Sequence, residues 1–336
     1  MKKSIKIFIL GCNGFIGNAL VEKLIKHKNI KIIGIDINSN NLSNLKKNKN
    51  FIFHKGDVNK KDAWIKNTIK KSDIIIPLVA IATPKVYVTN PLFVFQLDFE
   101  SNLKVIKYVA QYNKRLIFPS TSEVYGMTND QDFNEYKTNL TVGPISKSRW
   151  IYSCSKQLLD RVIHAYGEND HLNYTIFRPF NWIGPKLDDL KKAQLGNGRV
   201  MIIFIEKILK NKNIVLVDGG KQTRSFTYLD DGINALENII LLDNNKTKNK
   251  IFNIGNPKNN CSIKDLANYM IKYFNSVSKK KYKGKVIVKS QRNFYGKNYE
   301  DIPHRVPDIS EAIRYIGWNP SFNLQESIKR TMDYYI

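Results

Sequence analysis

A tyrosine and a lysine four positions apart are the first pair of residues in this sequence that could act together chemically. They are Tyr152 and Lys156, in the run Tyr-Ser-Cys-Ser-Lys. Side chains four apart on a helix share a face, so the lysine cation can lower the pKa of the phenol. The phenolate could then take the proton of a hydroxyl group while a hydride leaves the carbon that bears it. The pair therefore predicts the oxidation of an alcohol.

Hydroxyl and carboxyl side chains follow an apolar run upstream of this pair. The run is Arg115–Pro119, and Thr121, Ser122 and Glu123 come shortly after it. A serine or threonine at the end of a strand can hydrogen-bond the reacting oxygen, and the sequence leaves open whether Thr121 or Ser122 does so. We therefore expect this segment to lie against Tyr152.

A glycine-rich turn indicates what accepts the hydride. Gly11, Gly14 and Gly17 follow the apolar run Ile5–Leu10 and open a helical pattern. Glycines there let the backbone turn tightly and approach a pyrophosphate, which rests on the amide N–H groups of a helix N-terminus. Asp36, at the end of the second apolar run, would bind ribose hydroxyls and repel a 2′-phosphate. The spacing therefore predicts a dinucleotide site that prefers NAD to NADP.

The predicted cofactor site has further members in and after these segments. The glycine-rich turn also carries Asn13, Phe15 and Ile16. Asp57 and Val58 follow a third apolar run, from which Asp57 could reach the adenine ring. The five histidines and three cysteines show no spacing typical of metal ligands, so we expect no metal.

Apolar runs separated by helix-length segments must position these residues. Runs that are apolar throughout and alternate with helices are typical of βαβ units in a parallel sheet. We therefore expect an α/β protein with a Rossmann-type doubly wound parallel sheet. Its strands are predicted at residues 5–10, 31–35, 51–53, 74–79, 115–119 and 174–178.

The alternation becomes irregular after about residue 181. A helix near Met201–Lys210 and short strands near Ile214–Val217 and Lys250–Ile254 predict a smaller C-terminal α/β part. We expect residues 1–180 to form the NAD-binding domain, with crossovers to the second part. Residues 181–336 would mainly bind the substrate, in a cleft between the two.

Composition excludes several classes of protein. Of the 336 residues, 42% are hydrophobic and 11% aromatic, which is enough for a buried core and excludes a disordered or disulfide-stapled chain. The longest apolar stretch, Ile74–Pro84, is shorter than the roughly 20 residues that cross a bilayer. Three cysteines without CxxC spacing favour a reducing compartment. We expect a cytoplasmic protein without stable membrane insertion.

The net charge of +25 arises from 54 Lys and Arg residues against 29 Asp and Glu residues. The lysines are scattered over almost every segment, with one modest cluster at residues 279–283. Scattered charge favours a solvated surface that attracts anionic ligands. We expect no nucleic-acid partner, although a nucleic-acid binder recruited by its charge stays an alternative, which would bind with a steep dependence on salt.

The motifs together resemble a known superfamily. The glycine-rich turn, the Ser-Glu-Val-Tyr-Gly run at residues 122–126 and the Tyr152–Lys156 pair are similar to those of extended short-chain dehydrogenases/reductases, the NAD-dependent epimerases and dehydratases of nucleotide sugars. A closer resemblance, over nearly the whole chain, is to the UDP-glucuronic acid decarboxylase domain of bifunctional polymyxin-resistance proteins, which serve lipid A modification with 4-amino-4-deoxy-L-arabinose. It rests on residues 74–84, 118–126, 149–153, 177–182, 218–222 and 304–305.

The resemblance implies a reaction in two steps. NAD oxidises the 4-hydroxyl of UDP-glucuronate, and the resulting β-keto acid loses CO₂ to leave an enolate that must be protonated. The tyrosine–lysine pair and the neighbouring hydroxyl would carry the oxidation. Glu123 would act beside the carboxylate, either as a general base or as a charge that favours its departure. Arg305 would hold the carboxylate and assist the protonation.

The resemblance also implies the substrate contacts. Ala82 and Tyr87 would line the sugar side of the site. Arginine suits phosphates through its planar fork, and the residues expected to bind UDP or glucuronate are Arg149, Asn181, Arg199 and Tyr299. The segment on the uracil side comprises Val215, Leu216, Val217, Asp218, Gly219, Gly220, Lys221 and Gln222.

The sequence departs from this family in three places. It opens with the nucleotide-binding strand, so we expect no formyltransferase domain. Val215 stands where the family has a lysine, which removes a side-chain contact but leaves backbone contacts possible. Ser148 replaces a proline before Arg149, which would loosen that loop.

Three other functions stay open. A UDP-xylose synthase performs the same oxidation and decarboxylation but returns the hydride, while Phe180-Asn181-Trp182 and Ala82-Thr83-Pro84 favour the branch that forms a ketopentose. A 4-epimerase would leave Glu123 and Arg305 without a task. A non-catalytic NAD-binding protein would not need the intact Tyr152–Lys156 pair. Superfamily members commonly pair through two helices, so we expect a homo-oligomer, dimeric or higher.

Overall fold

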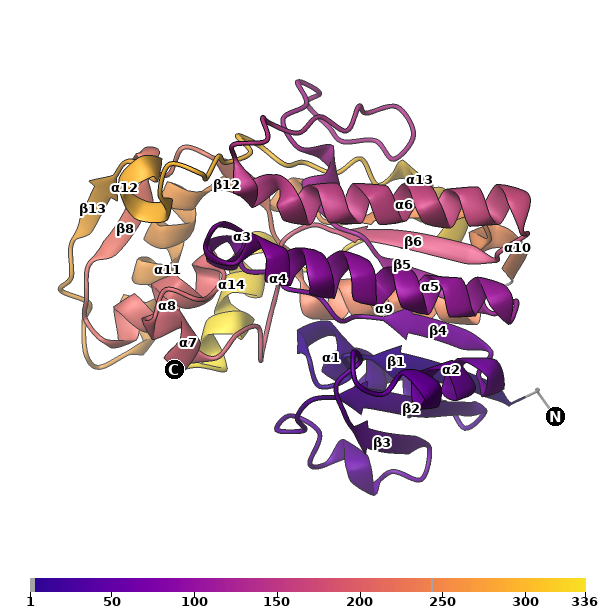
Figure 1. Ribbon diagram of the computed structural model, residues 1–336. Coiled ribbons are helices and arrows are strands. Elements are labelled where there is room, and N and C mark those ends of the chain that lie inside the picture. Colours follow the sequence, from indigo (N-terminus) through magenta and orange to yellow (C-terminus); the bar gives the residue numbers. More distant parts are fainter. Residues whose placement is uncertain (1–3, 243) are drawn as a thin grey trace.

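A parallel sheet forms the centre of the computed structural model, which describes residues 4–242 and 244–336 (Figure 1). Within these residues the sheet has seven strands in the order β11-β6-β5-β4-β1-β2-β3. The order reverses beside β1, and sheets of this kind bind ligands in the crevice at the carboxyl ends of the strands. The predicted doubly wound fold is confirmed. The strands are β1 (Ile5–Leu10), β2 (Ile30–Asp36), β3 (Phe51–Lys55), β4 (Ile74–Pro77), β5 (Arg115–Pro119), β6 (Tyr174–Pro179) and β11 (Lys250–Ile254).

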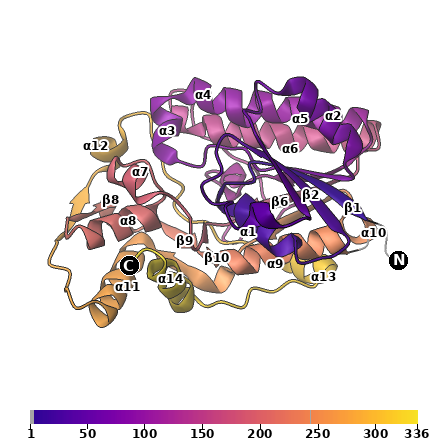
Figure 2. The ribbon, with the colours of Figure 1, turned by 90° about the horizontal axis from the view of Figure 1, so that it is seen from below.

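Helices cover both faces of the sheet (Figure 2). Alternate side chains of β1 point to opposite faces, so Ile7 and Ile9 enter the core formed with α1 and α9. Phe8 and Leu10 enter the core formed with α2, α5 and α6. Burial on both faces explains why the strands read as continuous apolar runs. The helices are α1 (Phe15–Leu24), α2 (Asp62–Lys71), α5 (Ser101–Gln111), α6 (Ile151–Asn169) and α9 (Leu229–Leu241).

A smaller part stands beside the carboxyl ends of the strands, at the left of Figure 1. Its core is formed by apolar side chains of α8, α11, α14 and β8. The parallel pair β8–β13 lies at its outer side (Figure 1). Its elements are α7 (Leu190–Gln194), α8 (Val200–Leu209), β8 (Ile214–Val217), α11 (Ile263–Val277), β13 (Val286–Lys289), α12 (Gln291–Tyr295) and α14 (Leu324–Asp333).

The strand at 250–254 is not where the sequence placed it. We expected it in the C-terminal part, but it is β11 and pairs in parallel with β6, with Phe252 opposite Phe177. Both side chains are fully buried in the core over α1 and α9, so the strand belongs to the central sheet. The predicted domain boundary at residue 180 stays a prediction. Residues 1–3 of the first predicted domain and residue 243 of the second lie outside the described ranges.

Short elements connect these layers. They include α3 (Pro84–Thr89), α4 (Pro91–Phe95), a π-helical turn (Gln96–Glu100), 3-10 turns (Leu45–Lys47, Ser122–Tyr125, Ser148–Trp150, Asp218–Gly220 and Pro257–Asn259), α10 (Asn244–Thr247), α13 (Ser310–Ile316) and the strand pairs β7 (Trp182–Ile183) with β10 (Thr227–Tyr228) and β9 (Thr223–Ser225) with β12 (Asn260–Ser262). Across residues 4–242 and 244–336, every helix is too short or too polar to reach from one side of a membrane to the other.

Candidate active site

A cavity of about 640 Å³ lies at the carboxyl ends of the strands. Its walls come from the sheet part, including the β1–α1 turn and the end of β5, and from the smaller part, including α8 and β8. This volume is typical of sites for small ligands and cofactors. The cavity therefore occupies the cleft that the sequence predicted.

The β1–α1 turn forms one end of the cavity. Gly11 adopts a φ of +83°, a conformation that favours glycine. A Cβ atom on Gly17 would collide with the carbonyl oxygen of Gly11, so the helix can begin this close to the strand only with glycine. The turn leaves its backbone open for a pyrophosphate. The predicted residues that line the cavity here are Gly11, Gly14, Phe15, Ile16 and Gly17.

Asp36 lies beside this turn, at the end of β2. Its Oδ2 accepts a hydrogen bond from the Asn13 amide at 3.0 Å, and its Oδ1 accepts one from the Asn38 amide at 3.3 Å. A carboxylate can accept about four hydrogen bonds, so acceptor capacity remains for ribose hydroxyls. Burial raises the pKa of Asp36, and these backbone hydrogen bonds act in the opposite direction. The residues present fit the NAD that the sequence predicted.

Three predicted cofactor residues have structural contacts outside the cavity lining. The Asn13 side chain accepts the amide of Asn41 at 2.9 Å and so ties the turn to the loop after β2. Asp57 accepts the amide of Asn59 at 2.9 Å, which closes its own turn. Val58 packs against the core beneath α2 and α5. A contact of Asp57 or Val58 with adenine stays a prediction.

Tyr152 and Lys156 face the cavity from α6, as the sequence predicted. The Tyr152 ring stacks on Tyr87 of α3 at a centroid distance of 4.8 Å. The Lys156 ammonium donates to the carbonyl oxygen of Pro119 at 2.9 Å and is buried. Both side chains therefore have fixed positions at the end of β5.

The expected lowering of the pKa of Tyr152 is not found. Burial raises the pKa of Tyr152, and the carboxylates of Asp98 and Glu123 raise it further, while a hydrogen bond with Thr121 lowers it. Burial also lowers the pKa of Lys156, which weakens the cation on which the expectation depended. Burial therefore dominates the pKa of Tyr152, and the spacing of the pair does not by itself lower that pKa.

Thr121 and Ser122 have different neighbours. Thr121 lies near enough to Tyr152 to lower its pKa, and the Thr121 hydroxyl accepts the amide of Glu123 at 3.2 Å, which caps the 3-10 turn. The Ser122 hydroxyl instead accepts from Nη1 of Arg305 at 3.4 Å. The hydroxyl beside the tyrosine is therefore that of Thr121.

Glu123 is held between two buried arginines. Its Oε2 lies 3.1 Å from Nη1 of Arg149, and its Oε1 lies 3.4 Å from Nη1 of Arg305. The three residues come from the 3-10 turn after β5, the turn before α6 and the segment before α13. The structure thus joins residues that the sequence associated only through the family resemblance.

A second, partly buried ion pair extends this cluster. Nη2 of Arg224 lies 2.7 Å from Oδ1 of Asp301, which also accepts the Tyr299 hydroxyl at 3.3 Å. Burial would raise the pKa of Asp301, but the guanidiniums of Arg224, Arg149 and Arg305 outweigh it and lower that pKa. The sequence missed Arg224 and Asp301, although they stand two residues beyond Gln222 and Tyr299, which it did select.

Arg305 has an unusually acidic guanidinium. Burial and the neighbouring cation of Arg224 lower the pKa of Arg305 to about 10. For Arg149, Glu123 together with Tyr299 and Asp301 outweighs burial, so the pKa of Arg149 is raised. Of the two arginines that hold Glu123, Arg305 therefore has the lower pKa.

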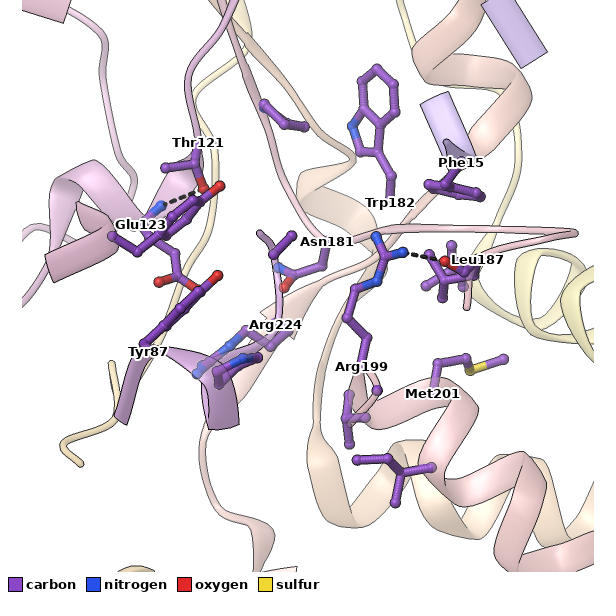
Figure 3. Close-up of a pocket in the computed structure, with 18 of the residues that line it drawn as sticks. Phe15, Tyr87, Thr121, Glu123, Asn181, Trp182, Leu187, Arg199, Met201 and Arg224 are labelled. Atoms are coloured by element: carbon purple, nitrogen blue, oxygen red, sulfur yellow. Dashed lines mark hydrogen bonds between the residues drawn. The ribbon is translucent and has the colours of Figure 1, made fainter. Parts of the chain in front are cut away.

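Arg199 stands across the cavity from Glu123 (Figure 3). Its guanidinium forms an ion pair with Asp188 at 2.8 Å, donates to the Leu187 carbonyl and lies 5.1 Å from the centre of the Phe15 ring. It therefore connects α8 with the cofactor turn. Its predicted contact with UDP stays a prediction.

The remaining substrate positions divide between cavity and core. Ala82, Asn181 and Tyr299 line the cavity. In the uracil-side segment, Val215, Val217 and Gln222 line it, whereas Leu216 packs into the core of the smaller part. Asp218, Gly219, Gly220 and Lys221 form the turn after β8 without lining the cavity.

Comparisons with known proteins agree with this architecture. A structure described as PbgP3 protein from Burkholderia pseudomallei is 43% identical, with a TM-score of 0.89 over 99% of this chain and 96% of that one. UDP-glucose 4-epimerase from Thermotoga maritima is 21% identical (TM-score 0.82, 98% of each chain) and shares the fold. So does UDP-glucuronic acid 4-epimerase from Bacillus cereus, at 23% identity (TM-score 0.80, 98% of each chain). Residues 7–255 match the NAD dependent epimerase/dehydratase family, so the chain belongs to this family and NAD is its cofactor.

Proposed function

We propose that this enzyme decarboxylates UDP-glucuronate oxidatively to a UDP-4-keto-pentose, as its sequence resemblance implies. The observation that carries the proposal is the Glu123 carboxylate held between Arg149 and Arg305 beside the Tyr152–Lys156 pair. Alcohol oxidation alone needs the tyrosine and a hydride acceptor. Glu123, paired with an Arg305 of lowered pKa, adds the acid–base groups that a second step, the decarboxylation, requires.

The charge around Glu123 supports an anionic substrate. Three guanidiniums, those of Arg149, Arg224 and Arg305, face two carboxylates, those of Glu123 and Asp301. One positive charge is thus left in excess within a buried cluster, where an uncompensated charge is costly. A substrate carboxylate would balance it, which favours a uronate over a neutral hexose.

The oxidation step would use the residues at the end of β5 and on α6. NAD, when bound, accepts the hydride that leaves C4 of the sugar. Thr121 would hydrogen-bond the 4-hydroxyl, and Tyr152 would take its proton. Burial disfavours the phenolate that this transfer requires, and the Lys156 ammonium, held by the Pro119 carbonyl, would act against that effect.

The decarboxylation step would use the Glu123–Arg305 pair. With a carbonyl at C4, the bond from C5 to the carboxylate carbon breaks, its electrons move to the C4 oxygen as an enolate, and CO₂ leaves. The negative charge of Glu123 would favour departure of the neighbouring carboxylate. Arg305, whose pKa burial and Arg224 lower to about 10, would then help to protonate C5.

A fold neighbour provides independent support for the ligands. The epimerase from Bacillus cereus was solved with UDP-glucuronic acid and NAD. At 23% identity it shares the fold alone, so the choice of decarboxylation rests on Glu123 and Arg305 of this chain.

The test uses purified protein with NAD and UDP-glucuronate. We expect absorbance at 340 nm to rise with one NADH per CO₂ released, and mass spectrometry to identify a UDP-linked ketopentose. Release of CO₂ without net NADH would indicate a UDP-xylose synthase. Interconversion of UDP-sugars without loss of CO₂ would indicate an epimerase and contradict the proposal.

A further inference from the structure

A buried asparagine joins the two segments that carry Glu123 and Arg305. Asn253 lies on β11 and is fully buried. Its Oδ1 accepts the Tyr125 hydroxyl at 2.8 Å. Its Nδ2 donates to the carbonyl oxygens of Phe133 at 2.7 Å and Asp308 at 3.1 Å. The whole hydrogen-bonding capacity of the amide NH₂ group is thus used.

Tyr125 connects Asn253 with the turn of Glu123. It ends the 3-10 turn Ser122–Tyr125, two residues after Glu123. Its ring lies against Phe133, at a centroid distance of 4.8 Å. Its hydroxyl, besides donating to Asn253, accepts from Nη1 of Arg178 at 2.9 Å. A rigid side chain therefore fixes the end of the turn in the core.

Asp308 connects the same asparagine with the segment of Arg305. Phe133 pairs with this segment, because its amide donates to the Val306 carbonyl at 2.8 Å and its carbonyl accepts the Asp308 amide at 3.0 Å. The two carbonyls that Asn253 binds are therefore fixed relative to each other. Arg305 stands three residues before Asp308.

We propose that Asn253, through Tyr125 and Asp308, is the positioning residue that sets the distance between Glu123 and Arg305. That distance is 3.4 Å, where a charge-assisted hydrogen bond is weak and a small shift breaks or strengthens it. The proposal rests on the proposed function, in which these two side chains act on the substrate carboxylate. Asn253 itself does not line the cavity and touches neither ligand in this scheme.

The experiment compares two tyrosines that each lose only a buried hydroxyl. Tyr125→Phe removes the bonds to Asn253 and to Arg178 and keeps the ring. Tyr174→Phe is the matched control, since the Tyr174 hydroxyl bonds His164 at 3.0 Å at the far end of β6. Single turnovers with NAD and UDP-glucuronate would follow NADH by absorbance and CO₂ by release of label from the carboxyl group.

We expect Tyr125→Phe to slow release of CO₂ about 10-fold, because a displaced group loses its near-attack geometry. Formation of NADH should change by less than about 2-fold, so the 4-keto uronate accumulates and can be trapped by borohydride. Tyr174→Phe should leave both rates unchanged. If the two rates fall together in Tyr125→Phe, or neither falls, Asn253 has only a structural role and the proposal is wrong.

A second variant tests the route through Asn253. Asn253→Ser should slow release of CO₂ at least as much as Tyr125→Phe does, and the double variant should add little to Asn253→Ser, because the two changes break one connection. Additive effects would overturn the route. If Asn253→Ser does not fold, the Tyr125→Phe comparison alone decides the outcome.

Failure of the proposed function is distinguishable. If the unmodified enzyme releases no CO₂, the proposed function fails, and calorimetry then compares the affinities for UDP-glucuronate and UDP-glucose. If Asn253 positions Arg305, Tyr125→Phe should reduce the preference for UDP-glucuronate over UDP-glucose about 5-fold or more, because the ion pair of Arg305 with the substrate carboxylate is weakened. An unchanged preference would overturn the positioning role as well.

Discussion

The cofactor end and the substrate end of the cavity are built in opposite ways. The cofactor end is a single turn, Gly11–Gly17, with Asp36 beside it, and its glycines bring backbone to the cavity wall. The substrate end is the cluster of Glu123, Arg149, Arg224, Asp301 and Arg305, whose side chains meet from distant segments and are buried except for the partly exposed Asp301. One end depends on the absence of side chains and the other on their charge.

Because of this difference, the two ends should tolerate different substitutions. A site made of backbone needs small residues at fixed positions, whatever the overall charge. A site made of buried ions needs each charge to keep its partner, because a charge buried alone is costly. Substitutions at one end should therefore leave the ligand of the other end bound.

The largest expected effect is at the substrate end. Glu123→Gln removes the carboxylate between Arg149 and Arg305 but keeps the shape of the side chain. We expect release of CO₂ to fall about 10³-fold, which is typical when a positioned acid–base or electrostatic group is lost. Protein fluorescence should show NAD affinity unchanged.

Glu326→Gln on the surface of α14 is the control for this change, since Glu326 forms an ion pair with Arg330 in the next turn. It should retain full activity. A Glu123→Gln enzyme that decarboxylates within 10-fold of the original rate would contradict the assigned role.

The next effect is at the cofactor end. In Gly17→Ala the new Cβ collides with the Gly11 carbonyl and the Cys12 backbone, so the turn must open. Forced overpacking costs about 1–3 kcal/mol in unfolding free energy, and we expect NAD affinity to fall about 100-fold because the amides no longer align. Calorimetry with UDP-glucuronate should show little change.

Gly14→Ala is the matched control within the same turn. A Cβ at Gly14 would lie 3.3 Å from the Gly11 carbonyl oxygen, and Gly14 has an ordinary φ of −69°. We expect a much smaller loss of NAD affinity. Equal losses in both variants would show that the space beside Gly17 is not what the turn requires.

The two ends also differ in how far sequence alone predicted them. The cofactor turn and the Tyr152–Lys156 pair are local patterns, and local spacing fixes their geometry once the strand and helix are known. The strands were predictable because burial on both faces demands continuous apolar runs. The resemblance to a family supplied Glu123, Arg149 and Arg305, but not their arrangement.

What sequence did not predict depends on contacts between distant segments. Arg224 and Asp301 are 77 positions apart, and no local pattern announces their ion pair. The pKa of Tyr152 rises because of burial and because Asp98 lies nearby, neither of which spacing reveals. For the same reason β11 was assigned to the wrong part, since the partner of a strand is chosen by the tertiary fold.

A smaller effect concerns Glu135, a buried carboxyl group next to Asn253, and the dependence of stability on pH. Burial raises the pKa of Glu135, which accepts the Asn253 amide at 2.7 Å, to about 7, while neighbouring Asp308 raises it and Arg178 lowers it. The folded protein therefore binds more protons than the unfolded chain between pH 4.5 and about 7. Stability from this group falls as pH rises through that interval.

Glu135→Gln should remove this dependence. We expect the variant to match the original protein at pH 5 and to exceed it at pH 8 by about 2 kcal/mol in unfolding free energy. Urea titrations at both pH values measure the difference. Parallel pH profiles for the two proteins would show that Glu135 does not titrate on folding.

The smallest expected effect concerns Val215, which lines the substrate end where related sequences are expected to carry a lysine. Val215→Lys adds a cation beside the bound nucleotide, and a partly exposed ion pair contributes about 0.2–1 kcal/mol. UDP-glucuronate should bind about 3-fold more tightly by calorimetry at low salt, and the gain should vanish at high salt. Val288→Lys on β13, opposite Leu216 and outside the cavity lining, adds the same charge without the contact. If both variants gain the same affinity for UDP-glucuronate, the net charge of the chain attracts the substrate. Binding at the substrate end would then depend less on the arrangement of its charges.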